Sequence, residues 1–333
     1  MLAKATDIFV LHDVEPSLID KDIQLFLKHN FLEISDRWGG LDGWPTREDV
    51  DLLRERSAGL FVYTVATIRF IDYKNRDPKR QLEILLRSPE SSTREGKTKF
   101  NTKTTLDSLY TSILQEAFDN DGPEDDPQIR SVLGAVVLAT NPVSPSTISA
   151  LLGLELEKVL SLLSSVHSLL VLQDDARRPV RPFHKSFPDF ILDPTRCTNQ
   201  RFRVRPPDQH AELLLGCLDF MGRELEQNMC KLPDLVLNSE VVDLKERIEE
   251  HIDQALQYAC RSWHKHLVGV VPANVTHSLH KFLEKKLLFW LEVLSVLGAT
   301  REAIDALDAT GKCKWLDVGH ITLLVHFQNL TRT

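Results

Sequence analysis

The chain has 333 residues, of which 42% are hydrophobic and 26% are charged, and its formal net charge at pH 7 is −8. This composition is close to the globular average and excludes disorder along the whole chain. The acidic balance argues against a general nucleic-acid or anionic-membrane coat. No apolar run reaches 18 residues, so no membrane span is expected. Five cysteines without a Cys-x-x-Cys pair predict free, mostly buried thiols in a reducing, cytoplasmic setting.

Residues 1–104 predict a helical region that ends in a polar linker. Residues 7–14 form an apolar run that indicates a short strand or an extended lead segment. Apolar residues at 3.6-residue spacing then predict helices over 20–34, 47–59, 60–71 and 78–86. Thr46 is suited to the N-cap of the second helix, and Pro78 to the first turn of the fourth. Residues 88–104 have no apolar period, which predicts a flexible loop.

Residues 105–205 have the pattern of a small helical domain with a β-hairpin. Thr105 is expected to cap a helix, and Pro127 is expected to begin the next one after an acidic loop. The remaining elements follow in the order helix, helix, strand, turn and strand, over 145–152, 154–166, 169–172, 174–179 and 180–184. This order matches a winged helix-turn-helix, in which a hairpin packs beside two crossed helices.

After residue 205 the pattern is helical throughout. Asp208 is expected to cap a long helix that includes Met221. Further helices are predicted over 244–258, 277–298 and 300–309. These patterns predict a mainly α fold class, in which helical bundle segments flank a winged-helix domain with a small β-hairpin. A complete P-loop α/β domain is not expected.

The tripeptide Gly96-Lys97-Thr98 matches the last three residues of a P-loop. The motif also requires a glycine five positions earlier, where this chain has Ser91, and a strand before it and a helix after it. The flanking residues are polar, so no aligned row of backbone N–H groups is expected to hold a phosphate there. We therefore interpret the tripeptide as part of the flexible loop.

Two histidine pairs are the candidates for a metal site. His264 and His266 are two positions apart, so their side chains point to different faces of a helix. His277 and His280 are three apart and can share a ligand, but no third ligand is close in the sequence. Packing or solvated roles are therefore expected, without a metal site. Because no nucleophile motif is present either, the chain is expected to have no catalytic residues and not to be an enzyme.

His184 is the candidate binding residue. It ends the second predicted strand of the hairpin, and Ser186 is expected to cap the short helix that follows. Between Asp174 and Arg205 there are eight Lys and Arg residues against four Asp and Glu, although the chain as a whole is acidic. A histidine N–H beside a helix start and several arginines suits a phosphate oxygen. A histidine that is hydrogen-bonded within the core of the hairpin is the other interpretation.

Several segments carry a family resemblance through their order and spacing. They are Leu11-His-Asp-Val14, Ala58-Gly-Leu-Phe-Val-Tyr63, Leu106-Asp-Ser-Leu-Tyr110, Phe183-His-Lys-Ser-Phe-Pro-Asp-Phe190, Tyr258-Ala-Cys-Arg-Ser-Trp-His-Lys-His-Leu267 and Phe282-Leu-Glu-Lys-Lys-Leu-Leu-Phe-Trp-Leu-Glu-Val-Leu294. Through them the chain resembles the part of fungal NACHT-type NTPases that follows the nucleotide-binding core. These NTPases are relatives of the NLR and STAND signalling proteins, and the resemblance covers nearly the whole chain.

The resemblance implies three consecutive regions. Residues 1–104 correspond to the end of the NACHT core and to the small helical domain with its polar linker. Residues 105–205 correspond to the winged-helix domain, and residues 206–333 to a second helical domain. In the family, this module switches between an ADP-bound closed state and an ATP-bound assembly state.

The resemblance also implies one nucleotide contact. His184 occupies the position of the winged-helix histidine of the Met-His-Asp-type motif, which in the family contacts the β-phosphate of ADP. Phe183 and Lys185 replace the Met and Asp of that motif. The Walker elements that supply the phosphate and Mg²⁺ ligands for hydrolysis are absent from this sequence. No cofactor is therefore expected, and ADP or ATP is expected to bind only if another chain supplies the nucleotide-binding core.

The sequence thus predicts a non-catalytic helical and winged-helix module with a regulatory or protein-interaction role in NACHT/STAND-type signalling. We expect a fragment of such a protein: a truncated gene model, a degenerate paralogue or a short protein that acts in trans. The expected partners are proteins, either a NACHT NTPase core or a second copy in a homo-oligomer, and neither a membrane nor nucleic acid. An exposed apolar docking surface is expected along residues 60–71 and 183–190.

A winged-helix DNA-binding protein is the alternative function, because of the pattern at 141–184 and the local basic residues. Its recognition helix would be Glu155–Ser165, which contains Glu155, Glu157 and Lys158 but no arginine. Contacts with base edges or phosphates usually need Arg, Lys, Asn or Gln. A third hypothesis, an enzyme of another class, has no constellation of residues behind it.

Overall fold

The computed structural model describes residues 16–73, 76–87, 102–118, 127–233, 236–269 and 272–312. Over these residues the protein is mainly α-helical and contains a sheet of two strands, which confirms the predicted fold class. The chain forms two compact units. Unit 1 comprises Met1–Gly122, Val166–Leu169 and Phe183–Thr198, and unit 2 comprises Pro123–Ser165, Leu170–Pro182 and Asn199–Thr333. The three-domain division at residues 104 and 205 stays a prediction.

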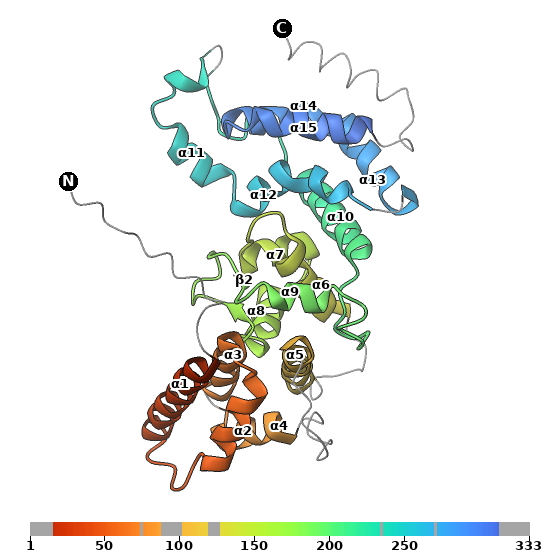
Figure 1. Cartoon of the computed structure of the whole chain (residues 1–333). Coiled ribbons are helices and arrows are strands. Elements are labelled where there is room, and N and C mark those ends of the chain that lie inside the picture. The colour runs from red at the N-terminus through yellow and green to blue at the C-terminus, as the bar shows by residue number, and fades with distance from the viewer. Residues whose placement is uncertain are drawn as a thin grey trace, which may run out of the picture. The chain divides into compact units, whose positions relative to one another are not determined.

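Unit 1 is a group of helices (Figure 1). Its described helices are α1 (Pro16–Arg37), α2 (Arg47–Ser57), α3 (Phe61–Ile71), α4 (Pro78–Arg87), α5 (Thr102–Phe118) and α9 (Ser186–Ile191). Helix α3 lies in the middle, because it packs against α1, α2, α4 and α5. Helix α9 comes from a distant part of the sequence and packs against α5. This contact brings the residues that follow the hairpin into unit 1.

Local hydrogen bonds explain where two helices of unit 1 begin and end. Thr46 and Asp49 form a capping box at the start of α2, as each side chain accepts the backbone N–H of the other residue. This confirms Thr46 as the N-cap. The buried guanidinium of Arg56 donates to the carbonyls of Leu85 (2.6 Å) and Leu86 (3.0 Å). It thereby satisfies carbonyl groups in the last turn of α4 that have no partner within the helix.

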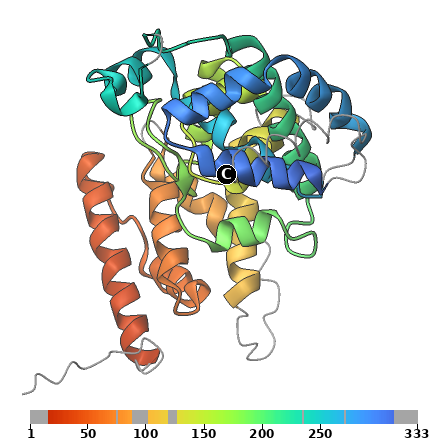
Figure 2. The same cartoon turned by 90° about the horizontal axis from the view of Figure 1, so that it is seen from above.

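Helix α1 is apolar on two opposite faces. One face is fully buried against α2 and α3 and consists of Ile23, Leu27, Phe31 and Ile34. The other is a row of leucines with exposed fractions of 50%, 68% and 64%, namely Leu18, Leu25 and Leu32. Figure 2 shows that the other helices of unit 1 lie on one side of α1, which is drawn in red. The described helices of unit 1 thus leave this row of leucines, which we call the α1 leucine row, uncovered.

The apolar surface predicted along residues 60–71 and 183–190 is largely buried instead. Most of α3 is covered by its neighbouring helices, although Phe61 at its start is 42% exposed. Phe187 and Phe190 of α9 are each 1% exposed. Contacts between helices that are distant in sequence decide this outcome, since an apolar helix in the middle of a bundle has partners on every side.

Unit 2 is built around one long central helix. Its described elements are α6 (Pro127–Leu138), α7 (Pro145–Leu152), α8 (Leu156–Ser165), β1 (Leu170–Val171), β2 (Arg181–Pro182), α10 (Pro206–Glu224), η3 (Asn238–Glu240), α11 (Leu244–His251), α12 (Gln254–Ser262), η4 (Trp263–Leu267), α13 (Pro272–Lys285), α14 (Leu287–Val296) and α15 (Thr300–Gly311). Helix α10 packs against α6, α7, α12, η4 and α13. At Gly216, α10 approaches α7 so closely that a Cβ atom would collide with the carbonyl oxygen of Leu151.

The hairpin of unit 2 follows two helices, in the predicted order of helix, helix, strand, turn and strand. Strand β1 pairs with β2 in antiparallel fashion, with Leu170 opposite Pro182. Ser144 caps α7 by accepting the backbone N–H of Thr147, as expected for a Ser-Pro start. Gly153 ends α7 in the left-handed conformation (φ 64°). The assignment of these elements to a winged-helix domain stays a prediction.

Two predicted caps are wrong. Helix α5 begins at Thr102, so Thr105 lies inside it with a buried side chain. Helix α10 begins at Pro206, because consecutive prolines have the φ angle that a first helical turn requires. Asp208 therefore lies within the first turn, where its carboxylate is 3.2 Å from the guanidinium of Arg205.

Two long predicted helices are interrupted. The pattern over 244–258 corresponds to α11 and α12, because Asp253 caps α12 by accepting the backbone N–H of Leu256 (2.7 Å). The pattern over 277–298 corresponds to α13 and α14. The predictions for 7–14 and for most of 88–104 lie outside the described residues.

The four cysteines within the described ranges are buried free thiols, as predicted: Cys197, Cys217, Cys230 and Cys260. The fifth, Cys313, lies outside them. None of the helices in the described part of the chain combines the length and the apolar character needed to cross a bilayer.

Candidate functional site

His184 lies in unit 1, and its side chain is exposed. It does not end the second strand as predicted, because β2 ends two residues earlier, at Pro182. Ser186, the predicted cap of the next helix, is instead the first residue of α9, and Lys185 occupies the N-cap position without a side-chain hydrogen bond. The prediction of a Ser186 cap is therefore wrong. The carbonyl of His184 accepts the backbone N–H of Phe187 (3.2 Å), so the chain is already turning into the helix at His184.

Hydrogen bonds fix the orientation of the His184 ring. The backbone N–H of Ser186 donates to its Nδ1 (3.2 Å), and the Ser186 hydroxyl lies 2.7 Å from the same atom. Nδ1 is therefore an acceptor, and the Ser186 hydroxyl donates to it. The Tyr110 hydroxyl, 2.7 Å from the Ser186 oxygen, then donates to Ser186. In the neutral ring the proton is on Nε2, which is left as the outward-facing donor.

The packing of α9 on α5 holds this arrangement in place. The ring of Tyr110 lies 5.6 Å from that of Phe187 and 5.5 Å from that of Phe190. Burial raises the pKa of the Tyr110 hydroxyl, so it stays protonated and available as a donor. Arg196 contacts both carboxylate oxygens of Asp107 on α5 through its Nε and Nη2 atoms (2.7–3.1 Å). This ion pair ties the segment after α9 to α5.

The basic residues around His184 in the sequence are divided between the two units. Lys185 and Arg196 belong to unit 1, and Arg196 is bound to Asp107. Arg201, Arg203 and Arg205 belong to unit 2, where they line a cavity. The sequence analysis did not predict this cavity. His184 itself offers one outward N–H donor, which suits a phosphate oxygen. Its contact with the β-phosphate of ADP stays a prediction.

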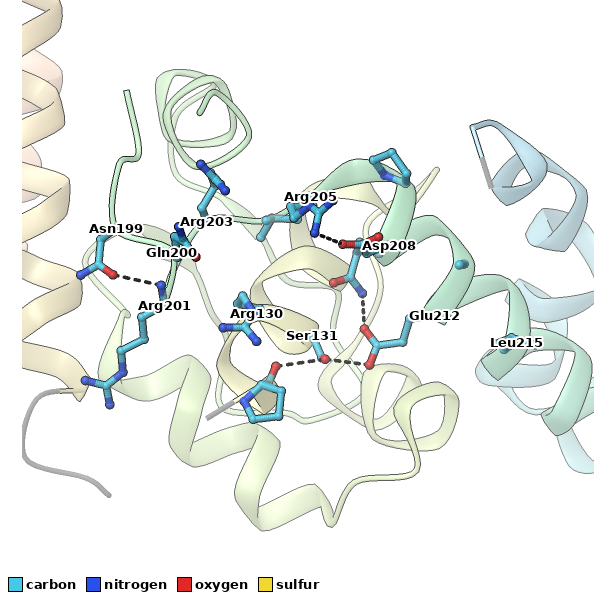
Figure 3. Close-up of a pocket in the computed structure, with 15 residues that line it drawn as sticks. Arg130, Ser131, Asn199, Gln200, Arg201, Arg203, Arg205, Asp208, Glu212 and Leu215 are labelled. Atoms are coloured by element: carbon cyan, nitrogen blue, oxygen red, sulfur yellow. Dashed lines mark hydrogen bonds and ion pairs between the residues drawn. The ribbon is translucent and has the colours of Figure 1, made fainter. Parts of the chain in front are cut away.

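The arginine cavity, as we call it, has a volume of about 930 Å³ and is lined by Arg130, Arg201, Arg203 and Arg205 (Figure 3). Arg130 comes from the first turn of α6, and the other three come from the segment that leads into α10. Within this segment Phe202 and Val204 are buried. The three arginines beside them line the cavity instead.

Two carboxylates also line the arginine cavity, and both already have hydrogen-bond or ion-pair partners within the protein. Glu212 accepts hydrogen bonds from Ser131 (2.7 Å) and from the side-chain amide of Gln209 (3.0 Å). Asp208 pairs with Arg205. Among the described residues, the guanidinium of Arg203 has no hydrogen-bond or ion-pair partner. The lining of the cavity therefore contains four arginines and two carboxylates.

The two histidine pairs have different environments. His264 and His266 are buried in η4, and His266 lies between two partners. Its Nε2 is 2.9 Å from the Tyr258 hydroxyl, and its Nδ1 is 2.9 Å from Nδ1 of His210 on α10. His277 is exposed and His280 is half-buried, on α13.

The hydrogen bonds of His266 fit neutral rings. Tyr258 donates to Nε2 of His266, whose Nδ1 then donates to His210. Burial, with a smaller effect from His210, lowers the pKa of His266 to about 3, and burial also lowers the pKa of His210. Across the described ranges, no group of three or more His, Cys, Asp or Glu side chains is placed to hold a metal ion.

Helix α8 is the element that the DNA-binding hypothesis would place in a groove. The side chains of Glu155 and Glu157 at its start are exposed, whereas Lys158 is half-buried. Negative side chains at this end would face the phosphates of DNA unfavourably. The DNA-binding hypothesis stays a prediction without a favourable observation behind it.

The chain is similar to a fungal protein. It is 25% identical over 232 aligned residues to the vegetative incompatibility protein HET-E-1 of Podospora anserina. The similarity covers 61% of this chain and 16% of HET-E-1, so the chain corresponds to a small part of that relative. No family model matches the chain, and no solved structure matches it. The similarity supports a relationship to fungal NACHT and STAND signalling proteins and no finer assignment.

Proposed function

We propose that this chain is a non-catalytic, regulatory helical module of a NACHT/STAND-type signalling protein that acts through contacts with protein partners. The distant similarity to HET-E-1 and the segments of NACHT-type sequence support the family relationship. The name of that relative suggests a role of the same kind, in vegetative incompatibility. The α1 leucine row is the observation that carries the proposed mode of action.

The α1 leucine row has the properties of a protein-binding surface. Leu18, Leu25 and Leu32 follow one another at intervals of seven residues. Because seven residues make about two turns of helix, their side chains lie along one side of α1. A helix that is apolar on opposite faces normally has partners on both of them. The described part of unit 1 covers only one face, so we assign the other to a partner protein. The partner proposed is the nucleotide-binding core of a NACHT protein.

Nucleotide chemistry would come from that partner and not from this chain. His184 offers a single N–H donor, and a charge-assisted hydrogen bond contributes about 1.5–3 kcal/mol. Micromolar affinity needs about 8 kcal/mol. His184 would therefore add to a phosphate site that a NACHT core supplies. On its own, the chain is proposed to bind no ADP or ATP through His184 and to hydrolyse none.

The test mixes the purified full chain with the purified nucleotide-binding core of a fungal NACHT protein and measures binding by calorimetry. The Leu25→Glu/Leu32→Glu variant should weaken binding by about tenfold or more, because it places charges on the apolar row. The matched control is Lys79→Glu/Arg87→Glu, which adds carboxylates at exposed positions on α4 and should leave binding unchanged.

The same experiment can contradict the proposal in two ways. Self-association of the chain that the leucine variant abolishes would make a second copy, and not a NACHT core, the partner. Absence of any protein association would remove the proposed mode of action. A separate assay of ATP turnover by the purified chain tests the non-catalytic role, which measurable turnover would contradict.

A further inference from the structure

We infer that the contact between His210 and His266 is an acid-sensitive latch, which holds α10 against η4 at neutral pH and is released by protonation. The Nδ1 atoms of the two rings lie 2.9 Å apart. A hydrogen bond between two histidine nitrogens needs a proton on one nitrogen and none on the other. The contact, which we call the histidine latch, therefore depends on the protonation of both rings.

The hydrogen bonds around the histidine latch run in one direction. The backbone N–H of Thr140 donates to the Tyr258 hydroxyl (3.3 Å), which in turn donates its own proton to Nε2 of His266 (2.9 Å). Burial raises the pKa of Tyr258, so its hydroxyl keeps that proton. In the neutral ring of His266 the N–H is then at Nδ1, which donates to His210. Nδ1 of His210 is thus fixed as the acceptor.

His210 is the ring through which acid acts. Its side chain is half-buried, whereas that of His266 is fully buried. A proton taken up by neutral His210 goes to Nδ1, because its other nitrogen already carries a proton. Two N–H groups would then face each other across the 2.9 Å contact. This arrangement is repulsive and leaves no acceptor for His266, so protonation of His210 breaks the link.

The surroundings of the histidine latch do not offset an added proton. Helix η4 packs against α10, α12 and α15. The groups that face the pair are a hydroxyl of α12 and two basic groups of η4, namely Tyr258, His264 and Lys265. The two carboxylates of α15 in this region, Glu302 and Asp305, act on His264. Over the described residues, no carboxylate forms a hydrogen bond or ion pair with either ring of the latch.

The absence of such a carboxylate explains the direction in which both rings titrate. Burial, with a smaller effect from His210, lowers the pKa of His266, and burial also lowers the pKa of His210. Both rings are therefore neutral at pH 7, and the histidine latch is closed. Release exposes the rings to water and restores their ordinary pKa, so acid favours the released state.

Release of the histidine latch should loosen η4 without unfolding unit 2. Trp263, the first residue of η4, is fully buried, and its ring lies 5.5 Å from that of Phe282 and 5.8 Å from that of Trp290. These rings connect η4 to α13 and α14. Helix α10 also packs directly against α12 and α13, and these contacts do not involve the two histidines. The expected change is therefore local to η4 and the first half of α10.

The test compares hydrogen exchange of the full chain at about pH 7 and about pH 5.5, after correction for the intrinsic effect of pH on exchange. A released histidine has a pKa of about 6.5, so uptake of one proton favours the released state by about tenfold at the lower pH. We expect the protection of η4 and of the first half of α10 to fall by about that factor. Helices α2 and α3 of unit 1 should change by less than about twofold.

The variant His210→Gln separates the histidine latch from other effects of acid. The side-chain oxygen of glutamine can accept the N–H of His266 and does not titrate, so η4 should be protected at both pH values. His210→Ala removes the acceptor and should leave η4 poorly protected at both. The matched control is His277→Gln, at an exposed histidine of α13, which should respond to acid as the wild type does.

NMR titration of the histidine rings in the wild-type chain is a second measurement that needs no variant. Protonation of His210 and the loss of protection in η4 should have the same midpoint, below pH 6.5, because burial lowers the pKa of the closed ring. Different midpoints for the two events would contradict the inference.

Three results of the exchange experiment would also overturn it. They are protection of η4 that is independent of pH, an acid response that His210→Gln retains in full, and an equal loss of protection over all of unit 2, which would indicate global unfolding. The α1 leucine row belongs to unit 1, so each of these outcomes leaves the proposed protein contact intact.

Discussion

The His184 site and the arginine cavity both lie in or beside the most basic stretch of the sequence, but they use their arginines differently. In unit 1, Arg196 makes a bidentate pair with Asp107 and holds α5 to the segment after α9. In unit 2, Arg203 has no such pair among the described residues, and it faces a cavity. Local positive charge therefore does not by itself define an anion site. What matters is whether the protein already supplies the counter-charge.

Among the substitutions that test this comparison, the largest change in stability is expected at Arg196. The Arg196→Ala variant should destabilise unit 1 by about 2–3 kcal/mol, because hydrogen bonds to a charged group are lost and Asp107 is left half-buried without its partner. Hydrogen exchange of α5 and α9 measures the loss. Arg203→Ala is the matched variant and should change stability by less than about 0.5 kcal/mol. Equal losses in both would erase the difference between the two sites.

The buried histidines of unit 2 also differ from the exposed His184, and the dependence of stability on pH should show this difference. The folded-state pKa of His266 is about 3 and that of His264 about 4, against 6.5 for an ordinary histidine. Both are therefore neutral when folded, and the unfolded chain binds more protons below pH 6.5. These two histidines therefore do not lower the free energy of unfolding above pH 6.5, but they lower it progressively as the pH is reduced toward 4.

For His266 alone, the expected loss is about 2 kcal/mol at pH 5, from about 1.4 kcal/mol per pH unit. Hydrogen exchange of α10 and α12 as a function of pH measures it. The groups that face His266 are His210 and Tyr258, with His264 and Lys265 on its own element. His266→Gln should flatten the pH dependence, whereas His184→Gln, at an exposed histidine, should preserve it. A pH profile that His266→Gln leaves unaltered would contradict the assignment.

A smaller effect is expected from removing the hydroxyl of Tyr110. The Tyr110→Phe variant loses one hydrogen bond to Ser186 and should destabilise unit 1 by about 1 kcal/mol. It should also loosen the preference of His184 for the Nε2–H tautomer, which ¹⁵N chemical shifts of the ring report. Tyr73→Phe is the control in the same unit, as the ring of Tyr73 contacts His167 by stacking. An unchanged tautomer in Tyr110→Phe would show that the backbone N–H alone orients the ring.

The smallest effect is expected at His184 itself. His184→Ala should change the stability of unit 1 by less than about 0.5 kcal/mol, because the side chain is exposed. A thermal melt checks this. A loss comparable to that of Arg196→Ala would make His184 a structural residue and would weaken the case that its outward N–H serves a ligand.

Local signals explain how much of the fold could be predicted. The caps at Thr46 and Ser144 and the left-handed turn at Gly153 depend on residues within one helical turn, so the sequence specifies them directly. The predicted cap at Asp208 is wrong for an equally local reason, the two prolines that precede it. The apolar spacing over 20–34 predicts a helix, but it does not reveal which of the two apolar faces of α1 has a partner.

The sequence by itself determined the helical elements, the order of the hairpin after two helices, and the basic character of the stretch around His184. Only the tertiary structure decided which charged groups meet. Tyr110 and Ser186 are 76 residues apart in the chain, and Arg130 reaches the cavity from α6, whereas Arg203 lies in the segment before α10. Such contacts depend on how whole helices pack, and packing is governed by the combined burial of many apolar side chains rather than by any local motif.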